Sequence, residues 1–132
     1  MVVLDTNIII DHLRQSKKET FLLKIAKQYP KQILALSVIS IQELYEGQST
    51  KKNQLEQLLL ATVSPLTILA YTFEVSILAG QIARDLTQPI EFADSAIAAT
   101  CIINNAELLT LNSKHFNNIP NLKLLNLLPF SH

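Results

Sequence analysis

Short apolar runs alternate with helical segments along this chain, and this alternation limits what it can fold into. The apolar runs, which we predict to be strands, cover residues 2–4, 33–36, 66–69, 108–111 and 123–125. We predict helices directly after Asp5 and over residues 16–29, 40–46, 53–61, 72–86 and 92–105, from apolar spacing and from the prolines that end them. Strands that alternate with helices favour an α/β fold whose parallel sheet is covered on both faces.

Length and composition narrow the class of protein further. The 132 residues predict a single domain over 1–132. Apolar residues make up 48% and charged residues 17%, which excludes a disordered chain. Eleven Lys and Arg balance eleven Asp and Glu, which excludes a strongly basic nucleic-acid-binding protein but not a local basic patch. Cys101 is the one cysteine, so no internal disulfide forms. No apolar run approaches the ~20 residues of a membrane span, and we expect a cytoplasmic protein without membrane association.

Three carboxylates stand out by their positions. Ligands of parallel α/β sheets bind at the carboxyl ends of the strands, where the strand order reverses. Asp5 directly follows the first predicted strand, and Glu43 shares one helical face with Ser40. Asp94 begins a helix that is otherwise apolar nearly all round, and a charge there is costly to bury unless it is paired or bound to metal.

Each acid also has a structural interpretation. Asp5 could cap the helix that follows it, Glu43 could be a solvated helical residue, and Asp94 could be a first-turn acid favoured by the helix dipole. Taken together, three acids at strand ends repel one another, and a divalent cation relieves that repulsion. Oxygen ligands favour Mg²⁺ or Mn²⁺ over Zn²⁺, because Cys101 and the histidines lack zinc-ligand spacing. Magnesium held by carboxylates commonly acts on phosphates.

Four segments, in order, resemble the PIN-domain family and most closely its VapC-type toxins. They read VVLDTNIIID from residue 2, then SIQELYEG from residue 40, EFADSAIAAT from residue 91 and LLTLNSKHF from residue 108. The resemblance implies a PIN-like three-layer α/β/α sandwich with a central parallel sheet of four to five strands. It also implies a metal-dependent endoribonuclease with one or two Mg²⁺ or Mn²⁺ ions, leaving a 3′-hydroxyl and a 5′-phosphate.

The resemblance assigns roles to particular residues. Asp5, Glu43 and Asp94 match the catalytic, metal-binding acids. The hydroxyl residues Thr6, Ser40 and Thr110 match positions that hold those acids in place.

Asn112 departs from the family pattern, which often has a fourth acid there. Its amide oxygen can still bind a metal, but it attracts a cation less than a carboxylate does. The site therefore carries three formal negative charges instead of four, which disfavours a second metal ion. Asn112 also supports an alternative function, a PIN-like RNA- or protein-binding module with weak or no catalysis. A phosphatase of the type with an Asp two residues after the first is excluded, because Asn7 stands there.

The expected partners are an RNA substrate, with tRNA favoured, a cognate antitoxin and a second copy in a homodimer. Possible RNA contacts are Lys114, His115 and Arg14, with Lys17, Lys18, Lys51 and Lys52 as further cationic candidates. Each could equally be a solvated surface residue. A mean hydropathy of +0.25 predicts exposed apolar patches for the protein partners. We expect the antitoxin to dock on the helices at 16–29 and 53–61 and to place a basic side chain at the acidic site.

Overall fold

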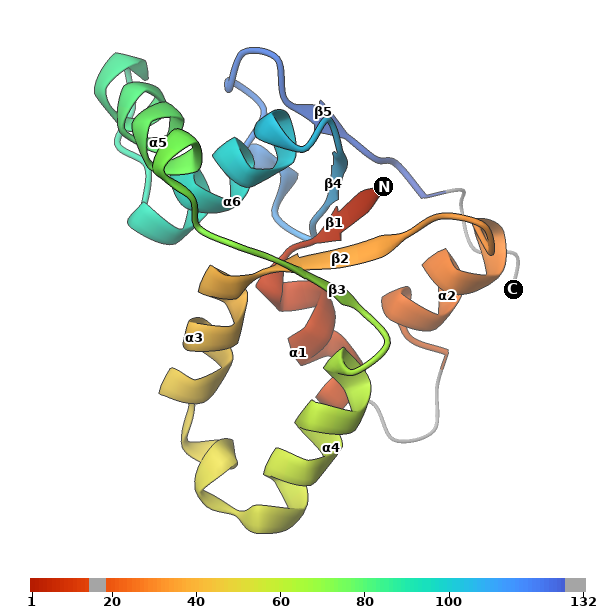
Figure 1. Cartoon of the computed structure of the whole chain (residues 1–132). Helices are drawn as coiled ribbons and strands as arrows, with labels where there is room; N and C mark the ends of the chain where they lie inside the picture. Colours follow the sequence, from red (N-terminus) through yellow and green to blue (C-terminus); the bar gives the residue numbers. More distant parts are fainter. Residues whose placement is uncertain (15–18, 128–132) are drawn as a thin grey trace.

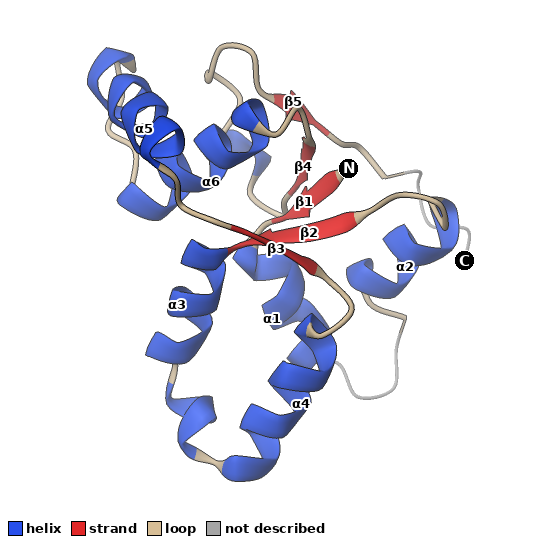
Figure 2. Ribbon diagram, in the orientation of Figure 1, coloured by secondary structure: helices blue, strands red, loops and turns tan. Residues whose placement is uncertain are grey.

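A computed structural model describes residues 1–14 and 19–127 (Figures 1 and 2). The strands are β1 (Val2–Leu4), β2 (Leu34–Ser37), β3 (Thr67–Leu69), β4 (Glu107–Leu109) and β5 (Lys123–Leu124). The α-helices are α1 (Thr6–Arg14), α2 (Phe21–Gln28), α3 (Val38–Glu46), α4 (Asn53–Val63), α5 (Phe73–Asp85) and α6 (Phe92–Ile103). Two 3₁₀ turns, η1 (Gln48–Lys51) and η2 (Ser113–His115), complete the described elements.

The five strands form one parallel sheet in the order β3-β2-β1-β4-β5. β1 lies at its centre, with Val3 opposite Ala35 of β2 and Leu108 of β4. Helices cover both faces, as Figure 2 shows. The predicted three-layer α/β/α sandwich with a parallel central sheet is therefore confirmed.

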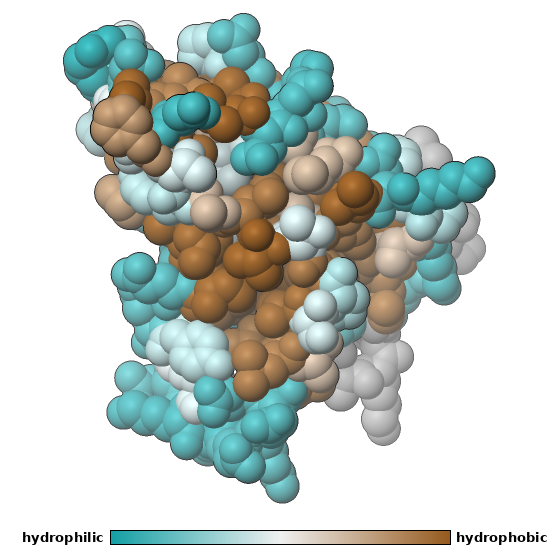
Figure 3. All heavy atoms as spheres, in the orientation of Figure 1, coloured by the Kyte–Doolittle hydropathy of each residue, from teal (hydrophilic) through white to brown (hydrophobic). Residues whose placement is uncertain are grey.

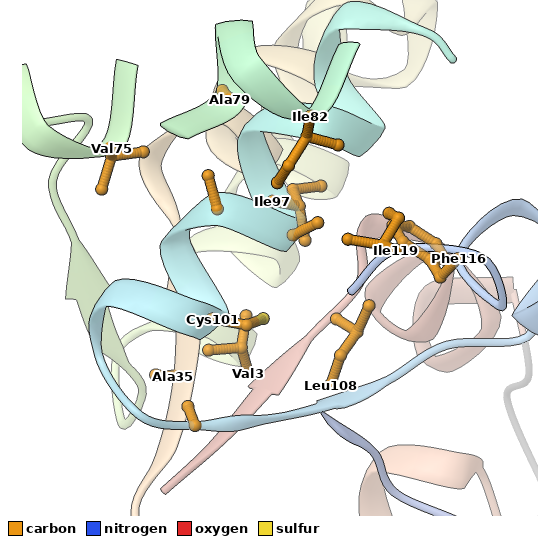
Figure 4. Close-up of a cluster of buried hydrophobic side chains, with 13 residues drawn as sticks. Val3, Ala35, Val75, Ala79, Ile82, Ile97, Cys101, Leu108, Phe116 and Ile119 are labelled. Atoms are coloured by element: carbon orange, nitrogen blue, oxygen red, sulfur yellow. The ribbon is translucent and has the colours of Figure 1, made fainter. Parts of the chain in front are cut away.

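The strands contribute side chains to two separate cores, one on each face of the sheet, because successive side chains of a strand point to opposite faces. Val3, Ala35 and Leu108 belong to the core beneath α5 and α6, where they meet residues such as Ile97 (Figure 4). Their neighbours Leu4, Leu36 and Leu109 pack instead against side chains of α1, α2, α3 and α4. Short strands with no polar alternation therefore fit a sheet buried on both sides.

The order in which the chain adds strands to the sheet reverses at β1. The chain first moves outward from β1 to β2 and β3 through helices on one face. It then crosses by α5 and α6 on the other face and enters β4, on the opposite side of β1. This reversal places the crevice of the sheet at the carboxyl ends of β1 and β4.

Two predicted boundaries shift for local reasons. α2 begins at Phe21 because the Thr20 hydroxyl caps it by accepting from the Leu23 amide, and residues 16–18 of the predicted helix lie outside the described residues. β4 ends at Leu109, because the Leu111 amide donates to the Asn7 side-chain oxygen instead of to a neighbouring strand. Thr110 therefore lies just beyond the strand rather than within it.

α6 ends on an asparagine in the left-handed region, Asn105, with φ 51°. Its amide donates to the Ile102 carbonyl, and the amide of Ala106 donates to the Cys101 carbonyl at 2.8 Å. These two bonds form a Schellman turn, a role that glycine fills more often. Within residues 1–14 and 19–127, no helix is long and apolar enough to cross a membrane.

Candidate active site

Asp5 lies at the crevice, in the step from β1 to α1. Its amide donates to the Leu109 carbonyl of β4, and its side chain is only 6% exposed. Oδ1 accepts from the Thr6 amide at 2.8 Å, and Oδ2 accepts from the Thr110 hydroxyl at 2.6 Å. A regular N-cap would instead accept from the second or third residue of the helix. Asp5 is thus fixed at the ends of both β1 and β4, by contacts that helix capping alone does not require.

Thr110 is fixed in turn by groups on both sides of the crevice. Its hydroxyl oxygen accepts from the Asn112 amide at 3.0 Å and from Asn7 Nδ2 at 3.4 Å. With the bond donated to Asp5, the hydroxyl has used its one hydrogen and both lone pairs. The sequence analysis gave Asn7 no role in the site. Its position two residues after Asp5 was the available signal.

A second set of hydroxyls connects Glu43 of α3 to the start of α1. Thr6 donates to Glu43 Oε1 at 2.6 Å, and its oxygen lies 2.8 Å from Ser40 Oγ. A hydroxyl has one hydrogen and a carboxylate only accepts, so the hydrogen between the two hydroxyls comes from Ser40. Ser40 is fully buried, and it shares the helical face of Glu43, as the spacing predicts.

Asp94 occupies the first turn of α6, with its side chain 17% exposed and its Oδ2 3.2 Å from Nδ1 of His115. Burial and, after it, the charge of Asp5 raise the pKa of Asp94, and His115 acts in the opposite direction. The pKa of Asp5 is also raised by burial, which outweighs the hydrogen bonds from Thr110 and Thr6. The charge of Asp5 therefore disfavours ionisation of Asp94.

Cys101 lies beneath the site and cannot act as a thiolate. It is fully buried, and burial together with the charge of Asp5 raises its pKa to about 12. A thiol held neutral in this way packs as a small apolar side chain and is unreactive.

The chemistry of the donor atoms suits a hard divalent cation. They are carboxylate oxygens, and a positive ion would relieve the unfavourable charge that burial imposes on Asp5 and Asp94. The structure does not gather all three acids around one point. Among the described residues, no group of three or more His, Cys, Asp or Glu side chains is arranged to hold a metal ion. Asp5 and Asp94 interact electrostatically, and Glu43 accepts a hydrogen bond from Thr6. The side chain of Asn112, the residue before η2, is exposed. Metal ligation by these residues stays a prediction.

Two pockets flank these acids. The first, of about 250 Å³, lies beside Asp94 between the α5–α6 loop and η2 and mixes polar with apolar side chains. The second, of about 440 Å³, lies beside Glu43 and is largely apolar, with walls from α1, α3, η1 and α4. The acids therefore separate two surfaces of different chemistry.

The candidate RNA contacts divide between the pockets. Lys114 and His115 line the first pocket, whereas Arg14 lines the second. Lys51 and Lys52 are exposed at the end of η1 and line neither pocket, and Lys17 and Lys18 lie outside the described residues. The sequence analysis missed Gln88, Glu91 and Asn118, which line the first pocket. Gln88 and Asn118 lie outside the four segments that resemble the family, and Glu91 begins the third of them but matches no assigned role. The fold alone brings their two loops together.

The fold and the site define a parallel α/β protein with buried acids at the reversal point of its sheet. A model of the PIN domain matches residues 2–122. The chain is 30% identical over 126 residues to "Ribonuclease VapC19" of Mycobacterium tuberculosis, covering 93% of this chain and 98% of that protein. It is 33% identical over 131 residues to "Ribonuclease VapC2" of Rickettsia felis, covering 94% and 96%. This chain belongs to the PIN domain family.

Solved structures agree with this assignment. VapBC2 from Rickettsia felis bound to a DNA fragment from its promoter matches with a TM-score of 0.84 at 30% identity, over 96% of this chain and 98% of that one. VapBC-1 from nontypeable Haemophilus influenzae matches with a TM-score of 0.79 at 26% identity, over 96% and 98%. DNA-bound VapBC from Salmonella typhimurium, at 24% identity over 94% and 96%, supports the fold alone with a TM-score of 0.80.

Proposed function

We propose that this chain is a metal-dependent endoribonuclease and the toxin of a toxin–antitoxin pair, acting in the cytoplasm. The observation that carries the proposal is the buried Asp5, braced by Thr110 and Thr6, with Asp94 close enough to raise the cost of a second charge. Relatives named as ribonucleases over almost the whole chain support it. RNA is the substrate, with tRNA favoured.

Asp5, Asp94 and Glu43, with Asn112 as a weaker ligand, would hold one or two Mg²⁺ or Mn²⁺ ions. Bound there, a divalent ion supplies an activated water and neutralises charge on the phosphate. The chain's own part is to keep its carboxylates fixed: Thr110 and the Thr6 amide hold the two oxygens of Asp5, while the Thr6 hydroxyl holds Glu43. Water attacks phosphorus, the bond to the 3′-oxygen breaks, and 3′-hydroxyl and 5′-phosphate ends result.

Cleavage of total RNA and folded tRNA by the purified protein, in Mg²⁺ or Mn²⁺, tests this function. We expect discrete fragments that disappear with EDTA and with Asp94→Asn. Asp85→Asn is the matched control, because Asp85 is exposed and forms an ion pair with neighbouring Arg84. Absence of cleavage in both metals by folded protein would contradict the nuclease. It would favour the alternative, a weakly catalytic or inactive PIN-like binding module.

The antitoxin partner fits the largely apolar pocket beside Glu43. Leu58 and Leu59 of α4 line it together with Leu44 of α3, and Figure 3 shows apolar side chains gathered between these two helices. α4 thus lines the pocket, as its predicted docking role requires, while no residue of α2 does. A helix of the antitoxin would bury apolar side chains here and bring a basic group to Glu43.

Titration calorimetry with the protein encoded beside this chain would test the docking surface. Leu58→Asp should weaken binding at least tenfold. Leu60→Asp should leave it unchanged, because Leu60 is exposed to a similar degree but does not line the pocket. Equal effects of the two substitutions would exclude this pocket as the docking surface.

The expected homodimer has a candidate surface on α5 and α6, which cover the other face of the sheet from the apolar pocket. Phe73 is 80% exposed on α5, and Ile77 and Ile103 are also exposed. Exposed side chains of this size favour a protein interface. We expect Phe73→Asp to convert a dimer to a monomer in light scattering, whereas Leu23→Asp on α2 should not. A wild-type monomer would contradict the homodimer.

A further inference from the structure

We propose that the pocket between the α5–α6 loop and η2 binds a single unpaired RNA base, next to the phosphate that is cut. The inference rests on the proposed ribonuclease function and adds a sequence preference to it. Asp94 forms part of the pocket wall, so whatever occupies the pocket lies beside the acids.

Two loops that are distant in sequence form this pocket. Residues 86–91 lead from α5 into α6 on one side, and residues 114–119, which comprise most of η2 and the turn after it, lie on the other. Phe116 and Ile119 are buried in the core beneath α5 and α6, which anchors the second loop. The pocket therefore has a supported floor.

The size and lining suit one base. About 250 Å³ is too small for a duplex, and sequence-specific proteins commonly take single RNA bases that have left their stack. Leu86, Pro89 and Ile90 provide apolar surface for the flat face of a ring. Gln88 and Asn118 carry amides, which donate and accept hydrogen bonds as base edges do.

The charges in the pocket determine which part of the nucleotide lies where. Lys114 can neutralise a phosphate, whereas Glu91 repels one. The Glu91 side chain makes no hydrogen bond to its own helix and is exposed, so its oxygens are available as acceptors. Acceptors of this kind bind the amino groups of bases. Adenine, cytosine and guanine carry such an amino group, whereas uracil offers an acceptor only its ring N3–H. The pocket should therefore discriminate against uracil.

Fluorescence anisotropy in EDTA tests this preference without any cleavage. The probes are labelled hexamers of adenosine, cytidine and uridine. We expect the adenosine and cytidine hexamers to bind about fivefold to tenfold more tightly than the uridine hexamer, the effect of one or two added hydrogen bonds. Glu91→Ala and Asn118→Ala should reduce this difference, and Lys114→Ala should weaken all three probes.

Lys123→Ala is the matched control for Lys114→Ala. Lys123 is exposed on β5 and pairs in register with Glu107, at the amino ends of the strands and away from the site. It should leave all affinities unchanged. Circular dichroism verifies folding of each variant.

Three results would overturn the subsite: no binding of any hexamer, equal affinity of the wild type for all three, or a preference unchanged in both Glu91→Ala and Asn118→Ala. Incubation of wild type with natural RNA in Mg²⁺ or Mn²⁺ separates the two proposals. Cleavage without a base preference would retain the nuclease and remove the subsite. A base preference that depends on Glu91, with no cleavage of natural RNA, would retain the subsite and remove the nuclease.

Discussion

The Thr6 hydroxyl donates a hydrogen bond of 2.6 Å to Glu43, although 37 positions separate the two residues. Thr6 also gives its amide hydrogen to Asp5 at 2.8 Å. One residue therefore fixes carboxylates from two different elements, β1's end and α3. The spacing between these acids depends on a side chain that itself has no acid–base role.

Replacing Thr6 by valine should therefore damage catalysis more than folding. The shape is retained, but Glu43 loses its donor, and displaced catalytic groups commonly cost about 10- to 100-fold in rate. The free energy of unfolding should fall by about 1–2 kcal/mol. Cleavage kinetics and denaturant titration measure the two effects. Thr6→Ser keeps the hydroxyl and should restore most of the rate; a serine variant as slow as the valine variant would contradict this role.

Asp94 should make the metal-free protein less stable as the pH rises. The pKa of Asp94 and that of Asp5 are both raised above the ordinary 3.8, so the folded state binds more protons than the unfolded state. The stability that these two groups contribute is fully present below their unfolded pKa of about 4 and is lost as the pH rises through the raised values of the folded state. Deprotonation of the two carboxyl groups therefore opposes folding, through burial and, for Asp94, also through the charge of Asp5.

Thermal unfolding in EDTA over a pH series checks this linkage. Asp94→Asn should gain in Tm relative to the wild type as the pH rises from about 4 to 7. Mg²⁺ or Mn²⁺ should raise the Tm of the wild type but not that of the variant. A wild type that is the more stable of the two at pH 7 in EDTA would contradict the raised pKa values.

Much of this architecture follows from local sequence signals. Apolar runs such as Val2–Leu4 predicted strands, and the strand–helix alternation predicted the parallel sheet. Where the described residues do adopt a positive φ, asparagines do so, at Asn105 and Asn121. That choice could not be predicted, because asparagine is equally common in ordinary turns.

The site was predictable in its members but not in its connections. Asp5, Glu43 and Asp94 could be selected because each lies near a strand or helix end. The pairing of Asp94 with His115, and the hydrogen bond from Thr6 to Glu43, depend on how α1, α3, α6 and η2 meet. Such contacts arise from packing between elements, for which a single sequence carries no local pattern.

Asn112→Asp should strengthen the binding of the metal ion that we propose. The side chain of Asn112 is exposed and makes no capping bond to η2, so the substitution removes no contact that the fold needs. An additional carboxylate attracts a divalent cation more than an amide does. We expect cleavage to reach half its maximum at a lower Mg²⁺ concentration, with Asn117→Asp as the exposed control. Identical metal titrations for wild type and Asn112→Asp would show that this residue lies outside the metal site.

Gly80 offers a stabilising change that leaves the site untouched. It lies within α5, and a Cβ built there meets no atom within 4 Å. Alanine in a helix interior is favoured over glycine by about 0.5–1 kcal/mol, so Gly80→Ala should raise the free energy of unfolding by that amount. The reverse substitution at exposed Ala83 of the same helix should lower it by a similar amount. Denaturant titration measures both, and RNA cleavage should not change in either variant. A Gly80→Ala protein that is no more stable, beside an Ala83→Gly protein that is less stable, would contradict the open surroundings of a Cβ at position 80.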